Sequence, residues 1–61
     1  SPLDYFINLK MQEAIRLLTN QSLRIKEVAY NLGYSDQYYF TRIFTKHIGS
    51  SPASFIKTIT R

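Results

Sequence analysis

The side chains best suited to chemistry gather between Gly33 and Gly49, on one side of a candidate helix. If Phe40 marks the buried side of that helix, the opposite side offers an amide, hydroxyls, a phenol and a guanidinium. These groups belong to Gln37, Tyr38, Thr41, Arg42 and Thr45, with Lys46 toward the edge. The only acid of the segment is Asp36, at its start, so this side carries no carboxylate.

A set of hydrogen-bond donors without an acid suits the edges of DNA bases. An arginine can bond two acceptors of guanine, and a glutamine can pair with adenine. Threonine and tyrosine hydroxyls can bond phosphates. Each residue taken singly is equally well explained as an ordinary solvated helix residue. Together, on the second helix of a pair joined by a glycine turn, they favour DNA binding.

Four segments with apolar residues at helical spacing must position this face. They run over about residues 2–19, 24–32, 36–47 and 51–60. No segment shows the sustained alternation that predicts a strand. The sequence therefore predicts one all-α domain over residues 1–61, with three to four helices, in which residues 24–47 form a helix-turn-helix.

Serines and glycines mark the expected helix boundaries. Ser1 and Ser51 each precede a proline and predict N-caps, and Ser35 is expected to cap the third helix. Gly33 and Gly49 are expected to end the second and third helices. The two Ser-Pro openings have two interpretations. Ser-Pro is a common way to start a helix, or the chain is one full repeat followed by the opening helix of a second copy.

The expected core takes one apolar side from each helix. It comprises Leu3, Ile7, Met11, Ala14 and Leu18, then Ile25, Val28, Ala29 and Leu32, then Phe40, Ile43 and Phe44, then Phe55, Ile56 and Ile59. The adjacent large pairs Tyr5-Phe6, Tyr38-Tyr39 and Ile43-Phe44 are expected to be mostly core. Tyr39 is expected to pack inward against Tyr34, and His47 to pack in the core or to favour the helix dipole.

Composition narrows the function classes. The chain has 61 residues, no cysteine and one histidine, which excludes disulfides and thiolate or multi-histidine metal sites. Lys and Arg outnumber Asp and Glu by eight to four, which favours a polyanionic partner. We expect no membrane span and no signal peptide, hence a cytoplasmic protein or a fragment of one. The scattered acids and isolated glycines predict neither an enzyme nor a cofactor site.

From Ile25 onward the chain resembles the C-terminal DNA-binding domain of AraC/XylS-type bacterial transcription regulators. The resemblance rests on the segments Ile25–Ala29, Leu32–Asp36, Tyr38–Phe44 and Gly49–Pro52 followed by Phe55. Residues 1–19 are similar to the helix that joins the two helix-turn-helix units of that family. The resemblance implies a homeodomain-like fold and a fragment that lacks the first unit and any sensor domain.

The resemblance also implies site residues. The recognition helix would be about residues 36–47, and it would enter the major groove of double-stranded DNA. Base-reading residues would be Gln37, Tyr38, Thr41 and Arg42. Phosphate-binding residues would be Arg24, Ser35, Thr45 and Lys46. Lys10, Thr45 and Ile56-Lys57 depart from the usual basic residues of the family, so phosphate binding would be weaker than typical.

A further partner is also expected for the full regulator, either RNA polymerase or the missing sensor domain, whereas the fragment itself should be monomeric. An alternative function stays open at this point. Helix-turn-helix folds can dock other proteins, so the chain could be a protein-interaction module that does not itself read DNA.

Overall fold

A computed structural model describes residues 1–20 and 22–59, and these residues form four helices and no strand. The helices are α1 (Pro2–Leu18), α2 (Ile25–Asn31), α3 (Gln37–Ile48) and α4 (Pro52–Ile59). The all-α expectation is confirmed. Of the expected 51–60 helix, residue 60 lies outside the described residues.

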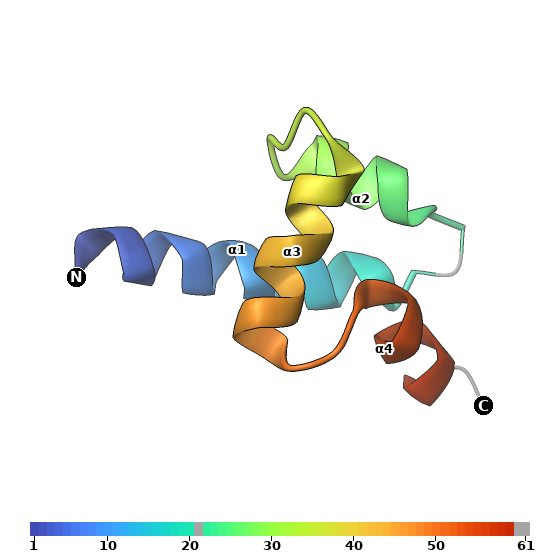
Figure 1. Cartoon of the computed structure of the whole chain (residues 1–61). Coiled ribbons are helices and arrows are strands. Elements are labelled where there is room, and N and C mark those ends of the chain that lie inside the picture. The colour runs from blue at the N-terminus through green and yellow to red at the C-terminus, as the bar shows by residue number, and fades with distance from the viewer. Residues whose placement is uncertain (21, 60–61) are drawn as a thin grey trace.

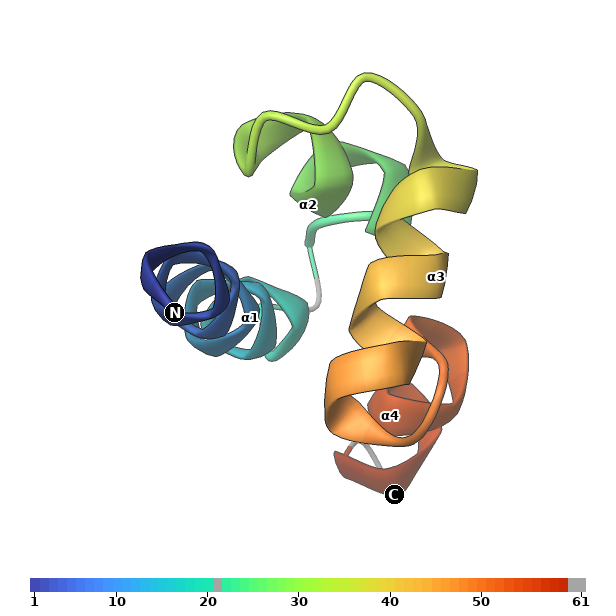
Figure 2. The ribbon, with the colours of Figure 1, turned by 60° about the vertical axis from the view of Figure 1, so that its left-hand side comes forward.

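Helix α3 is the centre of the arrangement. It crosses α1, with α2 at one of its ends and α4 at the other (Figure 1). Contacts join α1 to α2 and α3, and α3 to α2 and α4. Turning the molecule shows that one side of α3 carries no other helix (Figure 2). That uncovered side can therefore meet a partner.

The core lies where the first three helices meet. Its buried apolar residues are Met11, Ala14, Leu18, Val28, Ala29, Phe40 and Phe44. The Phe40 and Phe44 ring centroids are 5.7 Å apart, and Phe44 lies 5.8 Å from the ring of Phe55 on α4. Both phenylalanines are completely buried. The core thus fixes the rotation of α3 about its own axis.

The Ser-Pro openings cap their helices as expected. The Ser1 hydroxyl accepts a hydrogen bond from the Asp4 backbone N–H, at 3.3 Å. The Ser51 hydroxyl accepts one from the Ser54 N–H, at 3.1 Å. Gly49 ends α3 in the left-handed conformation, with φ of +99°, which glycine adopts without the penalty of a Cβ.

The start of α3 corrects the sequence prediction. Asp36, not Ser35, is the N-cap, and its carboxylate accepts a hydrogen bond from the Tyr38 N–H at 2.8 Å. A carboxylate in this position also interacts favourably with the positive end of the helix dipole, which a serine cannot do. Helix α3 therefore spans Gln37–Ile48, one residue later than expected.

Helix α2 begins beside a basic residue, as the sequence indicated. Arg24 takes the N-cap position, and its backbone N–H donates to the Glu27 carboxylate at 2.7 Å. The arginine side chain has no acceptor with which to cap the helix. Glu27 therefore satisfies the exposed N–H and supplies the negative charge that favours the helix start.

Several residues expected in the core are exposed instead. They are Leu3, Tyr5 and Phe6 on α1, Tyr38, Tyr39 and His47 on α3, and Ile59 on α4. The start of α1 extends past α2 and α3, so its first apolar residues stay exposed, and Ile7 is the first residue of the apolar stripe to pack against the core (Figure 1). Of the three adjacent large pairs, only Ile43-Phe44 is withdrawn from solvent. For His47, in the last turn of α3, the helix-dipole role remains.

Candidate nucleic-acid interface

The uncovered side of α3 carries two rows of side chains, each spaced four residues apart. One row is Gln37, Thr41 and Thr45, and the other is Tyr38, Arg42 and Lys46. We call these six residues the outer face of α3. Five of them are exposed and Thr41 is half-buried. Because Phe40 and Phe44 occupy the opposite side, burying them turns this face outward.

Tyr38 and Arg42 contact each other on this face. Arg42 Nη1 donates a hydrogen bond to the Tyr38 hydroxyl oxygen at 3.3 Å. The guanidinium carbon also lies 5.9 Å from the centroid of the Tyr38 ring. The hydrogen bond that Arg42 donates to Tyr38 raises the pKa of Arg42 above its ordinary value, and an arginine stays protonated in proteins.

The threonine row is partly committed to the helix itself. The Thr45 hydroxyl donates to the Thr41 carbonyl oxygen at 2.7 Å. This bond uses the one proton that the hydroxyl could donate to a phosphate. Thr45 can still accept a hydrogen bond in this arrangement, but it must rotate away from Thr41 before it can donate one.

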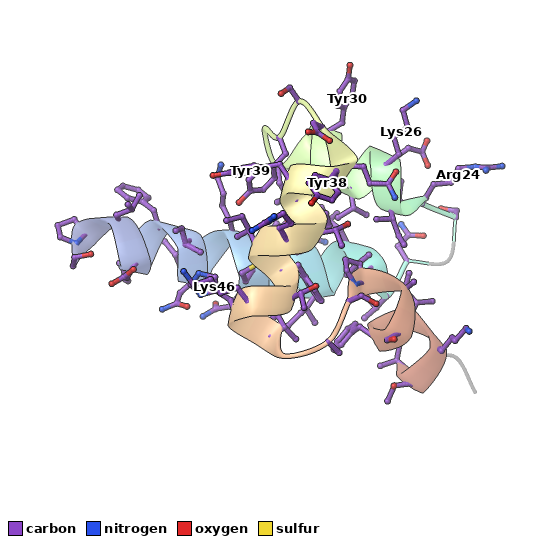
Figure 3. All side chains as sticks on the ribbon, in the orientation of Figure 1. Arg24, Lys26, Tyr30, Tyr38, Tyr39 and Lys46 are labelled. Carbon is purple, nitrogen blue, oxygen red and sulfur yellow. The ribbon has the colours of Figure 1, made fainter. Side chains whose placement is uncertain are left out.

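The other expected phosphate-binding residues lie around the outer face. Ser35 is exposed in the turn before α3, and Arg24 is exposed at the start of α2. In the view of Figure 3, Arg24 and Lys46 lie on opposite sides of Tyr38. Phosphate contacts fix the position and orientation of a protein on DNA, and cations beside a base-reading side chain are suited to make them.

Sequence reasoning missed two further exposed side chains near this surface. The Tyr39 ring does contact Tyr34, with centroids 5.9 Å apart, but Tyr39 remains 55% exposed. Lys26 on α2 lies close to Arg24 and points outward (Figure 3). The exposure of Lys26 could have been predicted from helical spacing, because Lys26 is two residues from the buried Val28 and so faces away from the core.

The turn between α2 and α3 is held against α1. The Lys10 ammonium lies 4.7 Å from the centroid of the Tyr34 ring, which also contacts Phe40 at 5.5 Å. Burial raises the pKa of Tyr34, and the nearby Tyr39 adds to this effect. Gly33, with φ of +92°, allows the chain to reverse immediately before Tyr34. These contacts fix where α3 begins.

Outside this face the described residues offer few other sites. Within residues 1–20 and 22–59, no cluster of three His, Asp or Glu side chains could hold a metal ion. No helix in that part of the chain is long and apolar enough to cross a membrane. A shallow surface depression on and beside α2 is lined by Leu23, Glu27, Tyr30 and Asn31.

Comparisons with known proteins point to one family. A family model described as a helix-turn-helix domain matches residues 1–58. The chain is 36% identical over 55 residues to the MmsAB operon regulatory protein of Pseudomonas aeruginosa, covering 90% of the chain and 18% of that protein. It is 44% identical over 52 residues to the uncharacterised HTH-type transcriptional regulator YfiF of Bacillus subtilis, covering 85% and 16%.

A third relative is the DNA-binding dual transcriptional regulator Rns of Escherichia coli. It is 39% identical over 49 residues, covering 80% of the chain and 18% of the relative. The chain thus spans less than a fifth of the length of these three relatives. No solved structure matches the chain.

Proposed function

Because the chain belongs to the AraC/XylS family of helix-turn-helix transcription regulators, we propose that α3 enters the major groove of DNA and reads bases with its outer face. The function of the chain is sequence-specific DNA binding in transcription regulation. The relatives are regulators, and we propose no catalytic activity for this chain.

One observation carries this proposal. Burial of Phe40 and Phe44 turns outward a face that has an amide, hydroxyls, a phenol and two cations, and no carboxylate. A major groove accepts such a helix because base edges there present acceptors as well as donors. The core of a protein–protein interface is depleted of charged residues such as lysine, whereas the outer face of α3 carries Arg42 and Lys46 and has no aliphatic side chain.

The proposed roles follow from position on the face. Bases are read by residues in the N-terminal half of α3, as in other recognition helices, namely Gln37, Tyr38, Thr41 and Arg42. Arg24, Ser35 and Lys46 contact phosphates. Thr45 does so only after its hydroxyl releases the Thr41 carbonyl.

We further propose that residues 1–61 are one domain of a longer regulator, with residues 1–19 as the helix that joins it to a preceding helix-turn-helix unit. The repeated Ser-Pro opening supports this proposal. In that repeat Tyr5 takes the place of Phe55, which packs against Phe44 of its own unit. Tyr5 is 63% exposed and would pack against a preceding unit in the same way.

The same proposal covers the partners and location of the full regulator and the oligomeric state of this chain. In the full regulator, a sensor domain or RNA polymerase would be a further partner, in the cytoplasm. The 61-residue chain itself would be monomeric.

Amide NMR titration with a random-sequence duplex, at low and raised salt, tests the groove-docked α3. We expect shifts at residues 35–46 and near Arg24 that fade with salt, because phosphate contacts release counterions. Lys57→Ala on α4 should leave the pattern unchanged. A well-dispersed spectrum that ignores DNA would overturn the proposal for this chain and favour a protein-interaction module.

A further inference from the structure

We propose that the Tyr38 hydroxyl is a positioning group, which holds the Arg42 guanidinium ready for base reading so that the two residues act as one unit. This inference rests on the proposed function, and it adds a specific role for the phenol. Tyr38 would then determine specificity through Arg42 as well as by its own contacts.

The spacing of the two residues favours this contact before any DNA arrives. Side chains of a helix lean toward its N-terminus, so Arg42 naturally extends back over Tyr38, one turn earlier. The hydrogen bond of 3.3 Å and the ring contact of 5.9 Å show that it does so. Lys46 lies one turn further on, and its charge disfavours the opposite orientation of Arg42.

Both side chains are free of the core, which makes their contact a feature of the surface. Tyr38 is 67% exposed, and Arg42 is exposed as well. An exposed arginine normally loses much rotamer freedom when it binds a base. A contact that already restrains it removes part of that loss. The phenol therefore improves binding through Arg42, in addition to the contact that its own hydroxyl makes with the DNA.

The arrangement also specifies what the unit can recognise. The Tyr38 oxygen accepts from Arg42, so its own proton is left to donate. The unit then presents only donors, from the guanidinium and from the adjacent hydroxyl. It suits a guanine, whose O6 and N7 accept from arginine, with a further acceptor beside it.

A double-mutant cycle tests the coupling. Wild type, Tyr38→Phe, Arg42→Ala and the double variant would be measured against a duplex selected by the wild-type chain from a random library. Each would also be measured against duplexes in which one base pair at a time is changed. We expect Tyr38→Phe to reduce the preference at the Arg42-read base pair about three- to tenfold. In the Arg42→Ala background the same change should have little effect there.

A matched control and a fold check separate positioning from general damage. Tyr30→Phe removes the same hydroxyl from the exposed face of α2 and should change no base preference. Thermal unfolding of Tyr38→Phe should match that of the wild type, because Tyr38 is outside the core.

The remaining outcomes distinguish the two proposals. Additive effects at the Arg42-read base pair would overturn the positioning role, while base reading by Arg42 would stand. An Arg42→Ala variant with unchanged preference at every base pair would overturn both. Loss of affinity in Tyr38→Phe that is equal for all duplexes would also overturn positioning, because it would assign the phenol to a phosphate.

Discussion

Arg42 and Lys46 lie one helical turn apart on the same row of α3, yet they should affect DNA binding differently. Arg42 stands near the first turns of the helix, which approach base edges, and it contacts Tyr38. Lys46 lies in the last turn, away from those first turns. A guanidinium can select a guanine through two bonds, whereas an ammonium acts mainly as a point charge.

Replacing Arg42 with alanine should relax the choice of one base pair. We expect a cost of about 1–3 kcal/mol on the preferred duplex and little change on unrelated duplexes. Binding selection from a random library, followed by affinity measurements, would show it. Arg16→Ala serves as the control, because it removes the same charge from an exposed position on α1, where Arg16 pairs with Glu13. An unchanged selected sequence would contradict base reading by Arg42.

Replacing Lys46 with alanine should weaken binding to all sequences alike. We expect the slope of log affinity against log salt to fall by about one unit, since one phosphate contact is lost. Fluorescence anisotropy over a salt series would measure this slope. Lys57→Ala removes an equal charge from α4 and should leave it unchanged. A loss confined to one sequence would show that Lys46 reads a base.

The adjacent aromatic residues Tyr39 and Phe40 on α3 differ in burial, and replacing each of them tests the packing of the core. Phe40 is completely buried, so Phe40→Ala should cost about 3–5 kcal/mol. That is comparable with the whole stability of a small domain. Tyr39→Ala should cost about 1 kcal/mol or less, because the ring is largely exposed. Urea unfolding followed by circular dichroism would compare them. Equal midpoints would contradict the burial of Phe40.

Helix boundaries set which residues of α3 reach a partner, and one cap decides the start of that helix. Asp36 accepts the Tyr38 N–H, whereas Ser35 precedes the cap. Sequence rules rank serine and aspartate almost equally as N-caps. The geometry of the turn after Gly33 decides between the two residues, because it determines which side chain lies next to an unpaired backbone N–H at the start of α3.

Replacing each of these two residues with alanine tests which of them caps α3. Asp36→Ala should lower the free energy of unfolding by about 1 kcal/mol, through loss of the carboxylate cap and of its favourable charge. Ser35→Ala should leave stability unchanged and should weaken DNA binding modestly if Ser35 contacts a phosphate. Thermal unfolding together with DNA titration would separate the two effects. A larger stability loss in Ser35→Ala would restore Ser35 as the cap.

At the scale of the whole molecule, α1 is packed along only part of its length. Met11, Ala14 and Leu18 are buried against α2 and α3, but Leu3, Tyr5 and Phe6 are more than 60% exposed. The apolar surface at the start of α1 is therefore available to other parts of a longer protein, as proposed above.

Two substitutions test this difference between the buried and the exposed part of α1. Met11→Ala should cost about 2–5 kcal/mol, because its side chain is buried. Phe6→Ala should change the stability of this chain by about 0.5 kcal/mol or less. In a chain that also carried the proposed preceding unit, Phe6→Ala should destabilise clearly. Urea unfolding of both chain lengths would decide, and equal small effects in both would contradict the proposed packing.

The sequence predicted much of the outer face of α3, because a buried Phe40 on a helix implies which residues lie opposite. It did not predict the exposure of Tyr39. The contact of Tyr39 with Tyr34 was foreseen, but a ring can touch a neighbour and still remain more than half exposed. Nor did it predict that the Thr45 hydroxyl donates its proton to the Thr41 carbonyl oxygen, since the direction of a hydroxyl depends on local geometry.

By itself, the sequence determined the four helices, the glycine that ends α3, both Ser-Pro caps and the family. These depend on residue spacing and on local hydrogen bonds, which a short segment carries within itself. The tertiary structure alone decided which apolar residues are core. Leu3 and Leu18 share one apolar stripe, yet only Leu18 meets another helix. Burial requires a second surface, and the crossing of α1 by α3 determines where that surface lies.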